Sequence, residues 1–316
     1  MSPRDGIRGG SGSILDSRAT AAYSIETDMS NEGKTILITG ASTGIGRASA
    51  LALANAGYTV YAGVRGEAAG VALIDEAPAS LRPRLRTLRI DVTDAAGIAA
   101  AAAGLDAELG TAGLWGLFNN AGIAVSGPIE CTPLERLREQ FEVNVFGQVA
   151  VTQACLPMLR RARGRILLTG SIAGFGTLPA LGPYSMSKHA VEALADALRR
   201  ELRPWGMQVS LLEPGSIATE IWGKGTRGYA EVREAPPPGL FELYGPLLEK
   251  LNQFAAQAAR DASPVEVVTR AVVHAFTATT PRTRYCMGQG STQRKLLRRL
   301  PDRWVDAVFA RALRWG

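Results

Sequence analysis

Short apolar runs rich in β-branched residues alternate along this chain with longer segments of helical pattern, and this alternation constrains the fold most. The strand candidates are Thr35–Thr39, Thr59–Val64, Leu85–Asp91, Leu114–Asn119, Arg165–Gly170 and Gln208–Glu213. Strands that are separated by helical crossovers pair in parallel, and helices then cover both faces of the sheet. The sequence therefore predicts an α/β fold with a doubly wound parallel sheet. Two helices should be long, Pro133 to about Leu159 and Tyr184 to about Leu202.

The composition agrees with a globular protein that has a large core. Of the 316 residues, 46% are hydrophobic and 20% are charged, which excludes a chain disordered throughout, a collagen and a coiled coil. The longest stretch without a charged residue, 166–187, holds four glycines and two prolines and is unsuited to a membrane-spanning helix. The cysteines, Cys131, Cys155 and Cys286, lie far apart and match no metal-binding pattern. We therefore expect no metal and a reduced, cytoplasmic protein.

The two ends of the chain differ from the middle. Residues 1–33 carry Gly and Ser clusters without an apolar signal segment, so we expect a disordered leader there. Residues 294–316 hold seven basic and two acidic residues, so the tail accounts for most of the net charge of +6. Apolar residues alternate with these arginines around Pro301, as in a basic amphipathic extension over residues 291–316. Packing on the protein itself is the commoner outcome for such a segment; another subunit or an anionic membrane surface is the alternative. No nucleic-acid-binding motif accompanies the charge, and we expect no nucleic-acid partner.

A glycine-rich turn joins the first strand to the helix that follows it. The turn contains Gly40, Ser42, Thr43, Gly44, Ile45 and Gly46, and an apolar helix from Arg47 to Ala56 comes next. Glycines let the backbone bend tightly and approach a pyrophosphate, while unpaired N–H groups at the helix start attract the anion. In an alternating chain, such a turn after the first strand predicts dinucleotide binding.

The spacing Thr39-Gly40-x-x-x-Gly44-x-Gly46 resembles that of the short-chain dehydrogenase/reductase family. The family's other marks follow in order along the chain: Asn119-Asn120-Ala121-Gly122, Asn144, Ser171, Tyr184-x-x-x-Lys188 and Pro214-Gly215. The resemblance covers about Lys34 to Met287 and points to members that act on hydroxysteroids and retinol. It implies a Rossmann fold with a parallel sheet of about seven strands in one domain, residues 34–290. It also implies an oxidoreductase that interconverts an alcohol and its ketone or aldehyde.

Three side chains of this set have the chemistry that carbonyl reduction needs. Tyr184 and Lys188 are four residues apart, which places them on one helix face, and Ser171 follows a strand at the edge where open α/β sheets bind ligands. Hydride transfer builds charge on the carbonyl oxygen, so a proton donor is required there, and a base is required in reverse. We expect Tyr184 to be this acid and base, with its pKa lowered by the Lys188 ammonium, and Ser171 to donate to the substrate oxygen. By the resemblance, Lys188 also holds the nicotinamide ribose, and Asn144 anchors a water that links Lys188 to solvent.

The residue after the second strand bears on the choice of cofactor. Arg65 stands where an NAD enzyme would place a carboxylate on the ribose 2′-OH, and a guanidinium can clamp a 2′-phosphate instead. NADP(H) is therefore favoured over NAD(H), although Thr43 stands where many NADP-preferring relatives have a basic residue. The resemblance implies further cofactor contacts at Asp91, Val92, Asn119, Ala121, Gly122, Pro214, Gly215, Ile217 and Thr219.

Residues 219–264 form an irregular segment in which glycines and prolines are interleaved with aromatic residues. In the family this region covers the substrate, so Trp222, Tyr229, Phe241 and Tyr244 predict an apolar lid. Such a lid favours a bulky hydrophobic alcohol or carbonyl substrate of steroid, retinoid or long-chain type. The alternative is that the rings only pack the segment onto the domain. Relatives are commonly dimers or tetramers built through their long helices, which implies a homo-oligomer.

Three alternatives stay open on the sequence alone. One is an NAD-dependent member of the same family, and another is a non-catalytic dinucleotide sensor, whose mark would be a broken set of Ser, Tyr and Lys. The third is an α/β-hydrolase, because Gly40-Ala41-Ser42-Thr43-Gly44 satisfies the G-x-S-x-G elbow with Ser42 as nucleophile. That elbow should follow several strands and precede an acid and a histidine. Ser42 instead follows the first strand, and the chain holds only two histidines, His189 and His274.

Overall fold

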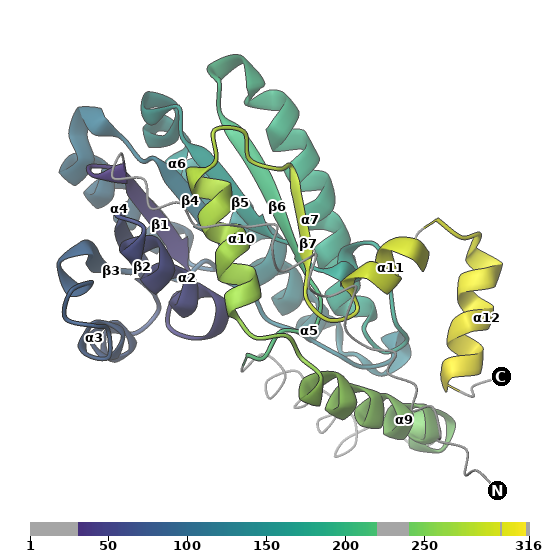
Figure 1. Ribbon diagram of the computed structural model, residues 1–316. Coiled ribbons are helices and arrows are strands. Elements are labelled where there is room, and N and C mark those ends of the chain that lie inside the picture. The colour runs from purple at the N-terminus through teal and green to yellow at the C-terminus, as the bar shows by residue number, and fades with distance from the viewer. Residues whose placement is uncertain (1–30, 220–239, 298, 314–316) are drawn as a thin grey trace, which may run out of the picture.

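The computed structural model describes residues 31–219, 240–297 and 299–313. Its centre is a seven-stranded sheet in the order β3-β2-β1-β4-β5-β6-β7 (Figure 1). All neighbouring strands are parallel. The strands are β1 (Thr35–Thr39), β2 (Thr59–Val64), β3 (Leu85–Arg89), β4 (Gly116–Asn119), β5 (Arg165–Thr169), β6 (Gln208–Pro214) and β7 (Arg284–Met287). The strand order reverses between β1 and β4, so the predicted doubly wound Rossmann fold is confirmed.

The strand ends agree best with the sequence where buried apolar runs are bounded by turn residues. β1 and β2 have their predicted limits, whereas β3 ends at Arg89 rather than Asp91 and β4 begins at Gly116 rather than Leu114. β7 is absent from the strand candidates. Its four residues include Arg284 and Cys286, which give little strand signal, and it lies at the edge of the sheet beside β6 alone.

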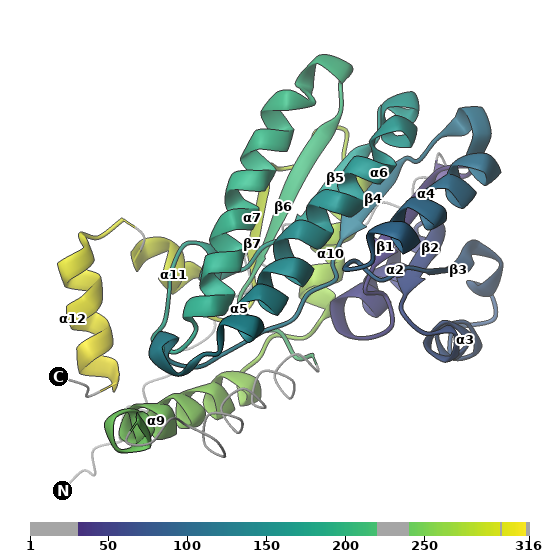
Figure 2. The same ribbon diagram turned by 180° about the vertical axis from the view of Figure 1, so that it is seen from behind.

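Helices cover both faces of the sheet, as Figure 1 and Figure 2 show from opposite sides. On one face lie α2 (Gly44–Asn55), α3 (Glu67–Asp75) and α10 (Glu266–Thr277), and on the other α4 (Ala95–Leu109), α6 (Gly147–Ala162) and α7 (Gly182–Glu201). Successive residues of a strand point to opposite faces, so β1 places Ile36 in one apolar core and Leu37 in the other. Short 3-10 turns complete this part of the chain: η2 (Arg82–Arg84), η3 (Gly110–Ala112), η4 (Ile129–Cys131), η6 (Ile172–Gly174) and η7 (Arg203–Trp205).

The helix predicted from Pro133 to about Leu159 is interrupted. α5 (Leu134–Phe141) passes into a π-helical turn, η5 (Glu142–Phe146), before α6 begins. Asn144 is fully buried in this turn, and its side chain bonds both the N–H and the C=O of Ile123. A buried carboxamide that finds its partners outside its own helix stabilises the wider turn. The other long helix, α7, begins at Gly182 and ends at Glu201, close to its predicted end at Leu202.

The predicted lid is helical in its second part. Residues 220–239, which include Trp222 and Tyr229, lie outside the described residues, but α9 (Leu240–Arg260) is a helix where the sequence predicts irregular structure. The irregular appearance of this segment comes from its glycines and prolines, and α9 itself contains Pro246. Leu247, Leu248 and Leu251 form a buried apolar stripe with Ala180, and this tertiary packing offsets the cost of the proline.

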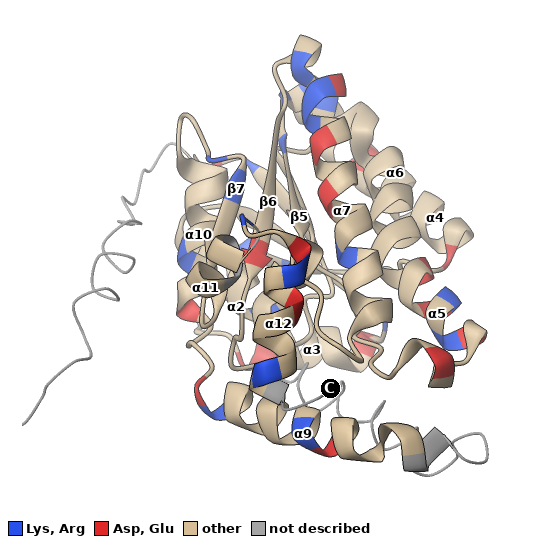
Figure 3. Cartoon of the chain, turned by 90° about the vertical axis from the view of Figure 1, so that its right-hand side faces the viewer, with Lys and Arg blue, Asp and Glu red and all other residues tan. Residues whose placement is uncertain are grey.

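The C-terminal extension forms two helices, α11 (Ser291–Leu297) and α12 (Asp302–Leu313), with the break at Pro301 that the sequence predicts. α12 lies against α9, so the extension packs on its own chain (Figure 1). Acidic and basic residues both occur along α12, where Asp302 and Asp306 balance Arg303 and Arg311 (Figure 3). The expected basic character therefore does not belong to α12 itself.

Ordered contacts of the domain reach into the expected leader. Residues 1–30 lie outside the described residues, but Asn31 is buried, and its Nδ2 donates to the Ala56 carbonyl over 3.1 Å. Across residues 31–219, 240–297 and 299–313, no helix combines the length and the hydropathy that crossing a membrane requires. Over the same ranges, no three His, Cys, Asp or Glu side chains are grouped to hold a metal ion.

Candidate active site

A cavity of about 680 Å³ lies at the carboxyl ends of the strands. This edge is where a doubly wound sheet binds its ligand, because the reversal between β1 and β4 opens a crevice there. The cavity collects most of the predicted site: Gly40, Ser42, Thr43, Gly44, Ile45, Arg65, Asp91, Val92, Ala121, Gly122, Ser171, Tyr184, Lys188, Pro214, Gly215, Ile217 and Thr219. Gly46, Asn119 and Asn144 are not among its lining residues.

The glycine turn between β1 and α2 fits a dinucleotide phosphate. Gly40 has φ +64°, and a Cβ placed there would lie 2.8 Å from the Cα of Ala121. A Cβ on Gly46 would lie 2.3 Å from the Gly40 carbonyl oxygen, so this glycine closes the turn from behind rather than facing the cavity. Thr43 precedes α2, and no side chain caps the helix among the described residues. The first N–H groups of α2 are thus free to bind an anion in the cavity.

Two neighbouring asparagines at the end of β4, Asn119 and Asn120, differ in their position relative to the cavity, and the predicted one does not line it. Asn119 is buried, and its Nδ2 donates to Thr152 Oγ1 over 2.8 Å, so its side chain ties β4 to α6. Asn120 lines the cavity instead, and its Nδ2 donates to the carbonyls of Thr39 and Gly40 over 3.1 and 3.0 Å. The side chain of Asn120 therefore holds the glycine turn in shape. Sequence reasoning passed over Asn120 because two adjacent asparagines give no sign of which one faces the ligand.

Ser171, Tyr184 and Lys188 meet at one wall of the cavity. Ser171 lies two residues after the end of β5, and its Oγ accepts from Ala173 N–H over 3.1 Å and donates to the Pro214 carbonyl over 3.4 Å. Tyr184, in the first turn of α7, shares a hydrogen bond with Ser171. The Lys188 Nζ donates to the Thr169 carbonyl over 2.7 Å and stands 5.6 Å from the centre of the Tyr184 ring. The three reacting groups predicted from the sequence therefore converge.

Burial controls the titration of this trio. Desolvation raises the pKa of Tyr184 above its ordinary value of 10.0, and the hydrogen bond with Ser171 opposes that shift. Desolvation also lowers the pKa of Lys188 from 10.5 to about 7. The sequence predicted a lowered tyrosine pKa, whereas the protein alone does the reverse, because the cavity wall disfavours the charged form of both groups. Near neutral pH the Tyr184 phenol is thus neutral and Lys188 can release or take up a proton. The two groups can therefore take part in proton transfer.

Asn144 reaches the trio indirectly. Its Nδ2 donates to the Ile123 carbonyl over 3.0 Å and to Ser187 Oγ over 3.2 Å, and Ser187 immediately precedes Lys188. The side chain oxygen accepts from Ile123 N–H over 2.9 Å. Asn144 thus contacts α7 and the loop after β4. Its contact on α7 is Ser187, one residue before Lys188, the residue to which the resemblance links it.

At the end of the cavity beside β2 and β3, Arg65 and Asp91 provide one basic and one acidic side chain. Arg65 is exposed directly after β2, and Asp91 follows β3. The Oδ1 of Asp91 accepts from Thr93 N–H and Thr93 Oγ1 over 3.0 and 2.8 Å. These bonds and the positive charge of Arg65 lower the pKa of Asp91, so this carboxylate is charged near neutral pH. A cation and fixed acceptors thus stand side by side at this end.

The loop after β6 closes the opposite end. A Cβ on Gly215 would lie 2.1 Å from the Gln289 carbonyl oxygen, so only glycine fits where this loop meets the chain after β7. Ile217 pairs with Ser263 in a short bridge, which fixes the loop against the segment after α9. The side chain of Thr219 lies close to the glycine turn: a Cβ added to Gly44 would be 3.4 Å from the Cβ of Thr219. The walls of one cavity thus come from both halves of the sheet.

The remaining wall of the cavity is apolar. It combines the segment before α7 with one face of α9, through Leu178, Leu181, Leu251, Phe254 and Ala255. None of these five was a predicted site residue. Leu178 and Leu181 lie between the motif residues Ser171 and Tyr184, and the glycines and prolines of residues 219–264 obscured the helical periodicity of the other three. The apolar spacing of residues 247, 248, 251, 254 and 255 was the signal that could have found α9.

The arrangement does not support the hydrolase alternative. His274 bonds the Tyr285 hydroxyl over 2.8 Å, and His189 bonds the Ser185 carbonyl over 2.9 Å. Neither histidine lines the cavity that contains Ser42. A Ser42 nucleophile would therefore lack its base.

Comparison with known proteins decides the family. A family model described as short chain dehydrogenase matches residues 34–229. The chain belongs to the short-chain dehydrogenase/reductase family. It is accordingly an NAD(P)-dependent oxidoreductase, and the coarse expectation of an enzyme acting on hydroxyl groups with a nicotinamide cofactor is confirmed.

Three relatives of this short-chain dehydrogenase indicate how wide the family's substrates are. It is 37% identical over 284 residues to an NADPH-dependent 3-dehydrocapnine reductase of Ornithobacterium rhinotracheale, covering 88% of this chain and 96% of the relative. It is 37% identical over 280 residues to the mitochondrial D-beta-hydroxybutyrate dehydrogenase of Bos taurus, covering 85% and 80%. It is also 37% identical over 263 residues to the 11-beta-hydroxysteroid dehydrogenase type 2 of Homo sapiens, covering 81% and 64%. The resemblance to hydroxysteroid dehydrogenases is therefore confirmed.

Solved structures agree with the fold. A short-chain dehydrogenase from Streptomyces avermitilis superimposes with a TM-score of 0.69 at 30% identity. The match covers 89% of this chain and 95% of that one.

Proposed function

We propose that this short-chain dehydrogenase interconverts a bulky hydrophobic alcohol and its ketone or aldehyde with NADP(H). The observation that carries the proposal is the meeting of Ser171, Tyr184 and Lys188 in a cavity with a glycine-lined phosphate end and an apolar substrate wall. The glycine turn, Arg65, Asp91 and the loop from Pro214 to Thr219 would hold the cofactor. When bound, a nicotinamide supplies or accepts the hydride.

The protein's own groups carry the proton. Tyr184 donates a proton to the substrate oxygen as its carbon is reduced and takes it back in the reverse direction. Ser171, already bonded to Tyr184, turns its hydroxyl toward the same oxygen and orients it. Lys188, whose pKa burial lowers to about 7, can exchange a proton near neutral pH and so returns Tyr184 to its starting state. Asn144 holds α7 through Ser187, and its water relay by family resemblance belongs to this proposal.

The preference for NADP(H) rests on Arg65. An exposed guanidinium at the end of β2, beside a cavity with no carboxylate at that position, suits a 2′-phosphate. The Arg65→Gln variant should raise the KM for NADP(H) about tenfold or more, while the KM for NAD(H) stays within about twofold. Equal KM values of the wild-type enzyme for both cofactors would contradict the preference.

The size and chemistry of the substrate follow from the apolar wall of α9 and the segment before α7. A cavity of about 680 Å³ that must also hold a dinucleotide needs its lid to open for a large substrate. We test the substrate class with nicotinamide absorbance across steroid, retinoid, long-chain and short polar alcohols and carbonyls. Higher kcat/KM for the lipophilic compounds supports the proposal, and faster turnover of short hydroxy acids or sugars rejects it.

Two surface properties complete the proposal. The homo-oligomer would use α5, η5 and α7, where large apolar side chains are exposed on neighbouring elements: Leu134, Phe146 and Met186. Contact of the C-terminal extension with an anionic membrane would use Trp304 and Val308, which are exposed one turn apart on α12. Sedimentation with anionic vesicles tests the second property, since Trp304→Glu should abolish any binding that the wild-type chain shows. The cytoplasmic location stays a prediction.

A further inference from the structure

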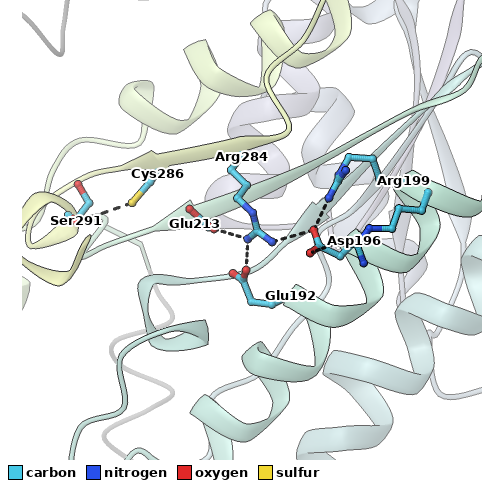
Figure 4. Close-up of polar contacts among 8 residues, drawn as sticks. Glu192, Asp196, Arg199, Glu213, Arg284, Cys286 and Ser291 are labelled. Carbon is cyan, nitrogen blue, oxygen red and sulfur yellow. Dashed lines mark hydrogen bonds and ion pairs between the residues drawn. The ribbon is translucent and has the colours of Figure 1, made fainter. Parts of the chain in front are cut away.

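A cluster of charged side chains lies behind the reacting trio, between α7 and the last two strands. Arg284 of β7 contacts three carboxylates, as Figure 4 shows. Its Nη1 donates to Glu213 Oε1 of β6 over 2.8 Å and also to Glu192 of α7, and its Nη2 donates to Asp196 Oδ1 over 3.0 Å. None of these four residues lines the cavity. The cluster is thus separate from the groups that touch substrate or cofactor.

Two of the three carboxylates of the cluster, Glu213 and Glu192, stand next to segments of the active site. Glu213 immediately precedes Pro214, whose carbonyl accepts from Ser171 Oγ over 3.4 Å. Glu192 lies one helical turn after Lys188 on α7. It also packs against the turn that follows Ser171, since a Cβ on Gly174 would lie 3.1 Å from Glu192 Cγ. Arg284 therefore joins the helix of Tyr184 and Lys188 to the strand that leads into the cofactor loop.

The cluster is more buried than an ordinary surface salt bridge. The Glu213 side chain is 3% exposed and the Glu192 side chain 13%, while Arg284 retains 31%. Two buried carboxylates share one guanidinium, because Asp196 is also neutralised by Arg199 over 2.8 Å. Breaking a buried pair of this kind leaves an uncompensated charge, so its loss displaces the elements it joins. When an exposed ion pair is broken, water solvates the remaining charge instead, so the elements that the pair joined need not move.

We propose that Arg284 is a positioning residue for the reaction, which fixes α7 against β6 and β7 so that Tyr184 and Lys188 stay aligned with Ser171 and the cofactor loop. This inference rests on the proposed function. Arg284 reaches the reacting atoms only through Glu192 and Glu213, so its effect should appear in the rate of the chemical step. The residues that line the cavity are unchanged, so the KM values for substrate and cofactor should change little.

The cluster also makes the alignment sensitive to pH. The groups that face Glu192 are Glu213 from β6, Arg284 from β7 and Asp196 on its own helix. Burial, and then the charge of Glu213, raise the pKa of Glu192 from 4.5 to about 7, and Arg284 opposes that rise. Near neutral pH, Glu192 is thus partly protonated, and its ionisation above pH 7 places a second negative charge beside Glu213. The fold holds this proton more tightly than the unfolded chain does, so its stability falls as pH rises from about 4.5 to 7.

The main experiment compares Arg284→Met with Arg284→Lys and with a matched control, Arg199→Met. Arg199 donates to the same Asp196 Oδ1 as Arg284, whereas Glu192 and Glu213 are bonded by Arg284, so this variant leaves those two contacts in place. We expect Arg284→Met to lower kcat at least tenfold with KM values within about threefold, Arg284→Lys to recover part of the loss, and Arg199→Met to keep kcat within about twofold. Wild-type kcat in Arg284→Met, or equal losses in Arg284→Met and Arg199→Met, would overturn the inference.

A second variant keeps the test decisive if Arg284→Met does not fold. Glu192→Gln preserves the shape of the side chain and removes its ionisation. The unfolding free energy of the wild-type chain should fall as pH rises from 4.5 to 7, and Glu192→Gln should remove this fall. The change in kcat near pH 7 that Lys188 confers should persist in both proteins. The same fall in unfolding free energy in both proteins would refute the role of the cluster. If the wild-type enzyme turns over no alcohol or carbonyl compound, the proposed function fails; if it is active and Arg284→Met matches it, only this inference fails.

Discussion

The Lys188 amine is almost completely buried, and this burial determines its pKa. The side chain is 3% exposed, and its Nζ donates to the Thr169 carbonyl. Desolvation lowers its pKa to about 7, whereas in the unfolded chain the group keeps its ordinary value of 10.5. Between these two values the unfolded chain binds more protons, so stability rises as pH rises through this window. Below pH 7 the buried ammonium weakens the fold most.

The Lys188→Met variant should therefore separate stability from activity. Relative to the wild-type chain, we expect it to gain unfolding free energy at pH 6 and to lose that advantage gradually toward pH 10. Turnover should fall by a factor of about 100 or more, because Tyr184 loses its proton partner. Urea unfolding of the cofactor-free proteins at pH 6 and pH 9 measures the first effect. The same stability difference at both pH values would show that Lys188 does not titrate in this range.

Tyr184→Phe tests the acid and base directly. The ring stays and the hydroxyl goes, so cofactor binding should remain within about threefold while kcat falls by about 10² to 10⁴. Tyr61→Phe is a suitable control, because Tyr61 is buried in the sheet and does not line the cavity. Near-normal turnover of Tyr184→Phe would assign the proton transfer to another group. Fluorescence quenching by NADPH measures the cofactor affinity of both variants.

At the scale of elements, a side-chain hydrogen bond and apolar packing both hold α9 on the domain. The hydroxyl of Tyr244 donates to Glu130 Oε2 of η4 over 2.8 Å, and Leu247, Leu248 and Leu251 supply the apolar contact. This hydrogen bond joins the first turns of α9 to η4. Its loss should let α9 move away from the domain more easily without moving Ser171, Tyr184 or Lys188.

Removal of that bond in Tyr244→Phe should accordingly raise the KM for a large hydrophobic substrate about two- to tenfold and leave kcat nearly unchanged. Glu130→Gln should have a smaller effect in the same direction, because an amide oxygen still accepts the bond. Glu249→Gln, at an exposed position of the same helix, serves as the control. A fall in kcat with constant KM in Tyr244→Phe would show that the bond serves the chemistry rather than the lid.

What the sequence could predict depends on how local the signal was. β1, β2 and the glycine turn follow from a few consecutive residues, and Tyr184 and Lys188 share a face by helical spacing alone. α9 was missed because the glycines and prolines before it obscured the apolar spacing of residues 247–255, and its packing on Ala180 is a contact far along the chain. The position of Asn119 away from the cavity and of Asn120 within it depends on Thr152 of a later helix. The lowered pKa of Lys188 depends on the burial of the whole site, which no single motif encodes.

On the scale of the whole molecule, the face formed by α5, η5 and α7 is the part most suited to meet a second copy. Leu134, Phe146 and Met186 are 52%, 55% and 46% exposed there, and these elements pack against one another. Exposed apolar side chains on neighbouring elements are a common mark of protein interfaces. The face lies on one side of the sheet, as Figure 2 shows, away from α10 on the other side.

We therefore expect Phe146→Glu to shift the sedimentation coefficient toward that of a monomer at micromolar concentration. The side chain is exposed, so the charge should lower the unfolding free energy of the monomer by less than about 1 kcal/mol. Val71→Glu, at a 53% exposed residue of α3 on the opposite side of the sheet, is the matched control and should leave the mass unchanged. A wild-type chain that sediments as a monomer would contradict the expected homo-oligomer.

The π-helical turn η5 sets the phase between α5 and α6. Each residue of an α-helix advances about 100° around its axis, so deleting Val143 to restore regular winding would rotate α5 by roughly that angle relative to α6. Gln140, whose amide binds the backbone at Ile123 and Val125, would then swing out of reach. The one additional residue of this turn thus orients both α5 and α6 toward the same loop. A change in the length of this stretch would therefore matter as much as a change in its side chains.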